Sequence, residues 1–398
     1  MTVRERIAFV CQRYGLEVNG GSELYCRQVA EKLTGRYDVT VYTSCAQDYN
    51  TWINCYPPGE EEINGVRVKR FPVLGQRDQE AFDELCRAVR DNPLHTDEEE
   101  RQWLEKQGPC CPELIEAVRE EAGNYRAVLF MTYLYYTAAM GLQQGIPNAL
   151  LIPTAHDEPW IYQRIYDLVF DGAKGIIWLT PEERDFARKR FPFVRRKTEV
   201  ITGIGMDPPE GDLPDLPEAL RGQAYLVYAG RIDPNKGCRE MFAYFRQYQK
   251  SFGGKLKLAL MGKAAMEIPE EPDIVPLGFV SEEMKLAVMR DALALVLFSP
   301  FESLSMVVLE SMMMGRPVLV REKCAVLKGH CLRSGAGLWF DSYPEFAGAV
   351  NYLLSHEKEY EQMRENGKAY VRANYSWVSI LDKYQWIIEQ MGRSDRQH

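Results

Sequence analysis

Continuous apolar segments that alternate with amphipathic ones constrain the fold of this chain more than any other feature of its sequence. Apolar runs of strand length occupy 6–12, 38–44, 127–132, 148–154, 175–180 and 198–202. Patterns with helical spacing separate them, for example 134–144 and 181–190. Strands that are apolar on both faces are typical of a parallel sheet covered by helices on both sides. The first half of the chain therefore predicts a doubly wound α/β domain.

A second domain of the same class is predicted after a Pro-rich, acidic linker. Residues 206–222, MDPPEGDLPDLPEALRG, show no periodicity. The alternation then restarts, with apolar runs at 224–230, 255–262, 274–280, 292–299 and 316–320, helical patterns at 236–250, 281–290 and 305–314, and successive helices over 343–391. We therefore expect an α/β protein with two Rossmann-like doubly wound domains, an N-terminal one over 1–205 and a C-terminal one over 206–375.

One charged segment of the first domain does not follow this alternation. Residues 75–113 are rich in charge and include the run HTDEEER at 95–101. We expect a partly helical insertion here, extending over about 75–121.

Charge and hydropathy argue against nucleic-acid binding and against a membrane-spanning helix. The net charge is −9, which disfavours nucleic acid as a partner. The basic run RDFARKRFPFVRRK at 184–197 is either a solvated helix face or a peripheral contact with anionic lipid headgroups. Apolar runs stay below the roughly 18 residues of a membrane helix, and the N-terminus resembles no export signal. We expect a cytoplasmic protein, with peripheral contact at the inner face of the membrane as an open alternative.

The ten cysteines and five histidines do not have the spacing of a metal site. No CxxC pair occurs, and the one adjacent pair, Cys110 and Cys111, has poor geometry for a single metal ion. We expect free thiols and no bound metal.

Two glutamates eight residues apart define the first candidate site. The stretch SPFESLSMVVLESMMMGRPVLV, residues 299–320, places Glu302 in a loop after an apolar strand and Glu310 inside an apolar helix. Unpaired N–H groups at the start of that helix are available to oxygen ligands. Because a carboxylate buried without a partner is costly, Glu310 either points to solvent or receives donors such as the paired hydroxyls of a ribose.

The stretch AGRIDPNKG at 229–237 is the second candidate site. Gly230 follows an apolar strand, Arg231 comes directly after it, and Lys236 lies five residues further on. Ligands of doubly wound sheets bind at the carboxyl ends of the strands, so two cations at this place favour a diphosphate. The alternative is an exposed, solvated pair of charges.

Two glycine turns carry weaker signals. Gly20 and Gly21, in NGGSE after the first strand, permit a tight turn beside an anion, and a plain turn capped by Ser22 is an equal alternative. The stretch LGFV places Phe279 before a helix start, where a ligand base or a purely structural turn is compatible with the pattern.

A lone histidine follows the strand at 148–154. His156 lies in TAHDEPW at the carboxyl end of that strand, where a catalytic role competes with a structural hydrogen bond. Asp157 follows it and either orients the ring or contacts an acceptor.

Taken together and in this order, these stretches resemble the retaining glycosyltransferases of family four, or glycosyltransferase group 1. FESLSMVVLESMMMGRPVLV looks like the EX7E element of that family, and AGRIDPNKG, GGSE and TAHDEPW resemble its Arg/Lys, glycine-loop and histidine segments. The resemblance implies the GT-B fold, in which two Rossmann-like domains face each other across a cleft. It also implies that a final helical segment at 376–398 crosses back to the first domain.

The resemblance further implies a role for each candidate residue. Arg231 and Lys236 would hold the donor diphosphate, with Gly230 beside them; Glu302 would contact the donor sugar and Glu310 the ribose. The other implied contacts are the backbone of Ser303, Leu304, Ser305, Met306 and Val307 with sugar and phosphate, Gly20 and Gly21 near the phosphates, Phe279 beside the base, and His156 under the sugar. One departure from the family is that the loop ESLSM lacks the glycines that many relatives have.

The implied reaction transfers a hexose from GDP-mannose or a UDP-hexose to a sugar or lipid-linked acceptor, with retention of configuration. No Asp-x-Asp occurs, so no metal cofactor is expected and Arg231 with Lys236 would supply the positive charge. Two alternatives stay open. One is a nucleotide-sugar 2-epimerase of the same architecture, and the other is a non-catalytic nucleotide-sugar-binding subunit.

Overall fold

The computed structural model describes residues 4–92 and 94–391, which form two compact units. The first unit combines the chain up to Ile204 with the chain from Ile380 onward, and the second extends from Gly205 to Ser379. The predicted final segment corresponds to helix α14, Trp377–Met391; the predicted residues 392–398 lie outside the described part of the chain.

The first unit is built on an eight-stranded sheet. Its strands are β1 Arg6–Val10, β2 Asp38–Ser44, β3 Gly59–Ile63, β4 Val66–Phe71, β5 Ala127–Met131, β6 Ala149–Ile152, β7 Gly175–Trp178 and β8 Thr198–Ile201. They lie in the order β3-β4-β2-β1-β5-β6-β7-β8, and neighbours are parallel except for the antiparallel pair β3 and β4. The predicted α/β doubly wound class is confirmed for this unit.

Strands β3 and β4 were not predicted, because neither is a continuous apolar run. β3 carries three consecutive glutamates on the exposed edge of the sheet. The two strands meet in a hairpin at Asn64 and Gly65, both with positive φ (49° and 81°). Asn-Gly is a strong hairpin signal. Asn64 and Gly65 therefore indicate this hairpin in the sequence, although neither strand is a continuous apolar run.

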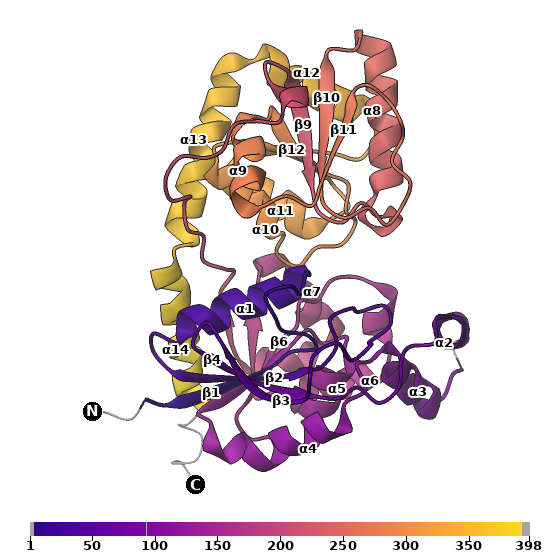
Figure 1. Ribbon diagram of the computed structural model, residues 1–398, viewed down its shortest axis with the longest axis vertical. Coiled ribbons are helices and arrows are strands. Elements are labelled where there is room, and N and C mark those ends of the chain that lie inside the picture. Colours follow the sequence, from indigo (N-terminus) through magenta and orange to yellow (C-terminus); the bar gives the residue numbers. More distant parts are fainter. Residues whose placement is uncertain (1–3, 93, 392–398) are drawn as a thin grey trace. The chain divides into compact units, whose positions relative to one another are not determined.

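Helices cover both faces of this sheet. They are α1 Gly21–Leu33, α4 Pro112–Glu121, α5 Tyr136–Leu142, α6 Ile165–Gly172, α7 Pro181–Arg190 and α14. In Figure 1, α1 lies against one face of the sheet, and α4 and α5 lie against the other. The charged segment predicted as an insertion contains α2 Gln79–Asp91 and α3 Asp97–Gln107, and α4 follows them.

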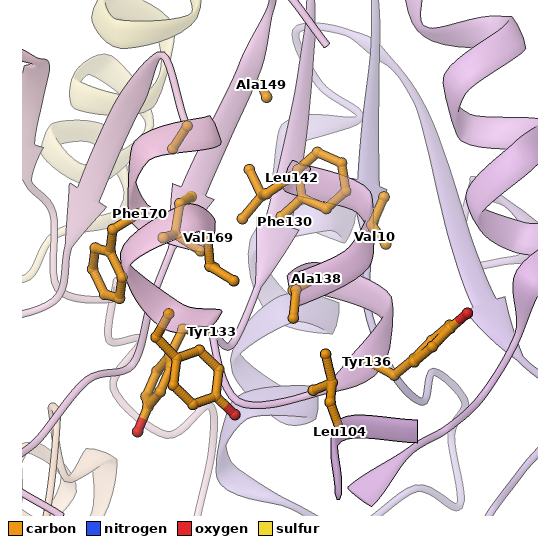
Figure 2. Close-up of a cluster of buried hydrophobic side chains, with 14 of the residues drawn as sticks. Val10, Leu104, Phe130, Tyr133, Tyr136, Ala138, Leu142, Ala149, Val169 and Phe170 are labelled. Atoms are coloured by element: carbon orange, nitrogen blue, oxygen red, sulfur yellow. The ribbon is translucent and has the colours of Figure 1, made fainter. Parts of the chain in front are cut away.

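The core of the first unit lies between α5, α6 and the central strands. Figure 2 shows Phe130 of β5 beside Leu142 of α5, with Val169 and Phe170 of α6 nearby. Gly141 makes this packing possible, because a Cβ there would lie 2.3 Å from the Phe130 ring. Each fully buried side chain of this size contributes about 1.5–3 kcal/mol.

The second unit is a six-stranded parallel sheet in the order β11-β10-β9-β12-β13-β14. Its strands are β9 Ala224–Ala229, β10 Leu256–Met261, β11 Ile274–Gly278, β12 Ala294–Leu297, β13 Val318–Arg321 and β14 Gly337–Phe340, and its helices are α8 Cys238–Phe252, α9 Glu282–Asp291, α10 Met306–Met313, α11 Ala325–Ser334, α12 Tyr343–Ser355 and α13 Glu357–Asn374. The second doubly wound domain is thereby confirmed. β14 and α11 were not predicted, because β14 lies at the edge of the sheet with its two central residues only half-buried, and α11 has a weak amphipathic pattern that includes Gly329.

Candidate active site

The turn after β9 holds a cation close to the sheet. Gly230, at φ 146°, leaves the strand, and Tyr228 donates a hydrogen bond from its hydroxyl to the Arg231 carbonyl at 2.7 Å. The Arg231 guanidinium lies 3.0 Å from the Asp233 carboxylate and is about one-third exposed. Asp233 also caps the short 3-10 helix Pro234–Lys236 by accepting from the Asn235 N–H. This turn therefore presents Arg231 at the carboxyl end of a central strand.

Lys236 and Glu302 form an ion pair that joins the two motifs predicted from sequence. Their Nζ and Oε1 atoms are 2.8 Å apart. β9 and β12 are neighbours in the sheet, so the segments after them, 66 residues apart in sequence, meet at one edge. Although desolvation works against the charge, the Glu302 carboxylate raises the pKa of the Lys236 ammonium above its ordinary value. Lys236 is therefore a permanent cation beside Arg231 and Glu302.

Gly237 is the residue that permits this close approach. Its φ is 74°, and a Cβ there would lie 2.4 Å from the carbonyl oxygen of Phe298, the residue after β12. Only glycine combines a left-handed conformation with room for a backbone carbonyl at that distance.

The Gly237→Ala variant should therefore lower the free energy of unfolding by about 3 kcal/mol, from the left-handed penalty together with the clash. Gly254→Ala is a matched control, because Gly254 also has positive φ (67°) but open space around its Cβ position. Its expected loss is about 1–2 kcal/mol. Chemical denaturation measures both, and equal losses would contradict the close approach at Phe298.

The loop of residues 302–305 leads into α10. Leu304 and Ser305 are buried, whereas Glu302 is half-buried. Ser305 is the N-cap of α10 and has a left-handed backbone, with φ 63°. The N–H groups of the first turn, at Met306 and Val307, have no preceding helical turn to bond, and both residues are half-buried. This end of α10 can donate to an oxygen ligand.

Glu310 is buried and only half satisfied. It is 6% exposed, and its Oε1 accepts from Lys285 of α9 at 2.9 Å. Its Oε2 has no hydrogen-bond partner among the described residues. Burial raises the pKa of the Glu310 carboxyl, and the charge of Lys285 opposes that rise. Of the two alternatives from sequence, solvent exposure is excluded; one oxygen has a donor, and the other has none among the residues that the structure describes.

Of two further residues in the second unit, Phe279 was a candidate site residue from the sequence and Lys285 was not. Phe279, after β11, is 74% exposed and offers a flat apolar face. Lys285 was not predicted, because a lysine inside an amphipathic helix carries no local sign that its partner is a buried carboxylate.

In the first unit, Gly20 and Gly21 begin α1. Gly20 is the N-cap, without a side-chain hydrogen bond, and a Cβ there would lie 2.2 Å from the Glu23 carboxylate. The alternative that Ser22 caps the helix is wrong, since the Ser22 hydroxyl donates to Glu23 instead. Arg13, which was not predicted, forms a buried ion pair with Glu23.

His156 lies beside a carboxylate that was not singled out from sequence. Its Nε2 is 3.4 Å from Oε1 of Glu158, and the Tyr133 hydroxyl donates to the same oxygen at 2.6 Å. Although burial opposes it, the hydrogen bond from His156 helps to lower the pKa of the Glu158 carboxyl. Asp157 is exposed and accepts from the Tyr162 hydroxyl at 2.7 Å. The sequence could have indicated Glu158, because it lies two residues after His156 in the stretch His-Asp-Glu.

Backbone strain accompanies His156 at the carboxyl ends of two neighbouring strands. Thr132 follows β5 and Thr154 lies shortly after β6, and both have positive φ (61° and 53°). Such conformations are costly for β-branched residues and are concentrated at functional sites.

The basic run at 184–197 is largely engaged in ion pairs within the first unit. Arg188 pairs with Glu199, Arg190 with Asp167 at 2.8 Å, and the Lys197 Nζ bonds the Asp171 carbonyl. Lys189, Arg195 and Arg196 are exposed. Within residues 4–92 and 94–391, no helix is long and apolar enough to cross a membrane, and no group of three metal-ligand side chains gathers.

The chain is similar to known proteins in sequence and in fold. Residues 217–370 match the family described as "Glycosyl transferases group 1". The chain is 25% identical to an alpha-D-kanosaminyltransferase of Streptomyces kanamyceticus over 65% of this chain and 74% of the relative.

Solved structures match over almost the whole length. A sucrose-phosphate synthase from Thermosynechococcus elongatus covers 99% of both chains at 18% identity and a TM-score of 0.64. The Anabaena protein HepE in complex with UDP and glucose covers 97% of this chain and 100% of its own, at 14% identity and a TM-score of 0.67. These matches confirm the predicted α/β architecture of two parallel-dominated sheets.

Proposed function

We propose that this chain, of which residues 217–370 match the family of group 1 glycosyltransferases, transfers a hexose from a nucleotide-sugar to an acceptor hydroxyl with retention of configuration. The observation that carries the donor site is the buried Glu310, whose Oε2 lacks a partner among the described residues. A buried carboxylate oxygen without a hydrogen bond costs about 1–3 kcal/mol. Hydroxyl groups of a bound ribose would donate hydrogen bonds to this oxygen. Ligand binding would then explain why a carboxylate that is costly to bury is present at this position.

The diphosphate of the donor is assigned to the cations after β9. Arg231 presents a planar fork of donors and Lys236 a point charge at the same strand end. In the proposed step the bond from the anomeric carbon to the diphosphate oxygen breaks, and its electron pair leaves with the diphosphate. The acceptor oxygen bonds the same face of that carbon, and its proton passes to a diphosphate oxygen. Arg231 and Lys236 stabilise the charge that develops on the leaving group.

The donor sugar is assigned to Glu302 and to the start of α10. Glu302 accepts hydrogen bonds from sugar hydroxyls, and its ion pair with Lys236 holds the carboxylate in place. Backbone N–H groups from Ser303 to Val307 approach sugar and phosphate oxygens at the positive end of the helix. Phe279 stacks on the base, for which its exposed ring is suited.

The roles of the first unit rest on the sequence resemblance. We assign His156 to the reacting sugar, Gly20 and Gly21 to the phosphates, and Asp157 to the acceptor. Glu158 holds the imidazole of His156, and the Tyr133 hydroxyl holds Glu158. Charge from Arg231 and Lys236 makes a metal cofactor unnecessary in this scheme, so activity is expected to persist in EDTA.

The acceptor is a sugar or a lipid-linked sugar. Contact of Lys189, Arg195 and Arg196 with anionic membrane is proposed with it, and co-sedimentation with phosphatidylglycerol vesicles tests that contact.

The decisive experiment incubates the protein with a panel of nucleotide-sugars and measures release of nucleoside diphosphate, with and without candidate acceptors. UDP-glucose and GDP-mannose come first, because the HepE complex contains UDP and glucose and the sequence leaves both bases open. We expect release that depends on an acceptor. Conversion of the donor sugar without an acceptor would indicate the epimerase instead, and nucleotide binding without turnover would indicate the non-catalytic subunit.

A further inference from the structure

Ser305 holds a backbone conformation that its own side chain does not support. Its φ of 63° and ψ of 77° lie in the left-handed region, which disfavours every residue that has a Cβ. An N-cap residue normally has an extended backbone and a side chain that bonds the helix. The Ser305 side chain makes no such cap bond, and its buried Oγ has no partner among the described residues. The conformation must be held from outside the residue.

The holding contact comes from a histidine on another helix. Nε2 of His330, in α11, lies 2.8 Å from the carbonyl oxygen of Leu304. This carbonyl belongs to the peptide group that joins Leu304 to Ser305. His330 is fully buried. Since a carbonyl only accepts, Nε2 carries the hydrogen and donates it.

The other side of the ring is fixed as well. Nδ1 of His330 lies 3.1 Å from the Tyr370 hydroxyl, which must donate because Nδ1 is then an acceptor. Arg333 donates to the Tyr370 hydroxyl, and the Tyr375 hydroxyl lies 3.1 Å from it. Burial, reinforced by the charge of Arg333, lowers the pKa of His330 to about 3. The ring is therefore neutral at physiological pH, and its tautomer is the one that the two contacts require.

We propose that His330 is a positioning residue for the donor site, since it holds the Leu304 carbonyl and thereby keeps Ser305 in the left-handed conformation that begins α10. This inference rests on the proposed function. With the carbonyl held, the N–H groups of the first turn of α10 are preset for the oxygens of the nucleotide-sugar. Without it, Ser305 relaxes to an extended conformation, and the ligand must restore the strained one when it binds.

The test is a double-mutant cycle between His330→Leu and Ser305→Gly, with UDP and GDP titrated by calorimetry. His330→Leu should weaken nucleotide binding about tenfold, or about 1.4 kcal/mol. Glycine adopts the left-handed conformation without help. In the Ser305→Gly background the loss caused by His330→Leu should therefore shrink to less than about threefold. Donor KM should follow the binding constants, while the acceptor KM stays unchanged.

His330→Gln is the conservative variant, because its amide nitrogen can donate to the Leu304 carbonyl from the place of Nε2. It should bind nucleotide within about threefold of wild type, which also keeps the inference testable where leucine unfolds the protein. An equal tenfold loss with and without the Ser305→Gly substitution, or wild-type binding by His330→Leu, would overturn the positioning role alone. Failure of the wild-type protein to bind either nucleotide would overturn the proposed function and this inference with it.

Discussion

The Arg231→Ala variant should lose about a thousandfold in kcat while it keeps its fold. Arg231 is the cation that can fork onto the leaving diphosphate, and removal of one preorganised transition-state donor costs about a hundred- to a thousandfold. The Arg231 side chain is about one-third exposed, and Asp233 keeps its hydrogen bond from the Asn235 N–H without it, so the ion pair contributes about 1 kcal/mol to stability. Steady-state kinetics and thermal unfolding, measured on the same preparation, separate the two effects.

Two further variants give this prediction its controls. Arg231→Lys keeps the charge without the planar fork, and we expect it to recover about tenfold of the lost activity. Arg372→Ala removes an exposed arginine from α13 of the same unit and should leave kcat unchanged. Loss of activity with Arg372→Ala, or full activity with Arg231→Ala, would contradict the assignment of the diphosphate to the turn after β9.

Replacing Glu310 by methionine should abolish tight nucleotide binding and at the same time destabilise the unliganded protein. The substitution removes the carboxylate proposed to hold the ribose, and two hydrogen bonds to a charged group correspond to about a hundredfold in Kd. It also removes a buried oxygen that lacks a partner among the described residues. It breaks the buried ion pair with Lys285 as well and leaves that ammonium beside the exposed Glu282, so the free energy of unfolding should fall.

Calorimetric titration with UDP and GDP measures the first effect, and denaturation without ligand measures the second. Glu282→Ala is the matched control, because Glu282 pairs with the same Lys285 from an exposed position. That variant should bind nucleotide as wild type does. If Glu310→Met loses stability and keeps its affinity, Glu310 is a structural partner of Lys285 and the ribose assignment is wrong.

Because Lys285 influences the pKa of Glu310, the assignment of Glu310 to the ribose can also be tested through the pH dependence of nucleotide binding. The pKa of Glu310 is already raised by burial, and Lys285 is the charge that opposes the rise. In Lys285→Ala the pKa of Glu310 should therefore rise further, so that the carboxylate takes up a proton at a higher pH than in wild type. Nucleotide affinity of this variant should decrease as pH falls, with a flatter profile for wild type. Parallel profiles would contradict the need for an ionised Glu310.

Local patterns predicted the elements whose signals are local. The apolar run 38–44 and the pattern at 181–190 match β2 and α7 to the residue. In α7, Thr180 accepts from the Glu183 N–H and Pro181 opens the helix, both of which are encoded by neighbours in sequence. β3 and β14 were missed because both lie at the edge of their sheet, where a strand needs no long apolar run.

The sequence by itself determined the fold class and the kinds of side chain that stand at the strand ends: two cations after β9, a carboxylate after β12 and a second carboxylate inside α10. Only the tertiary structure decided which of them meet. Lys236 reaches Glu302 because β9 lies beside β12, Glu310 is balanced by Lys285 of α9, and the Leu304 carbonyl is held by His330 of α11. Hydrogen bonds act over about 3 Å, so partners separated by 25 to 66 residues are set by sheet order and helix packing, and burial then decides which charge each partner keeps.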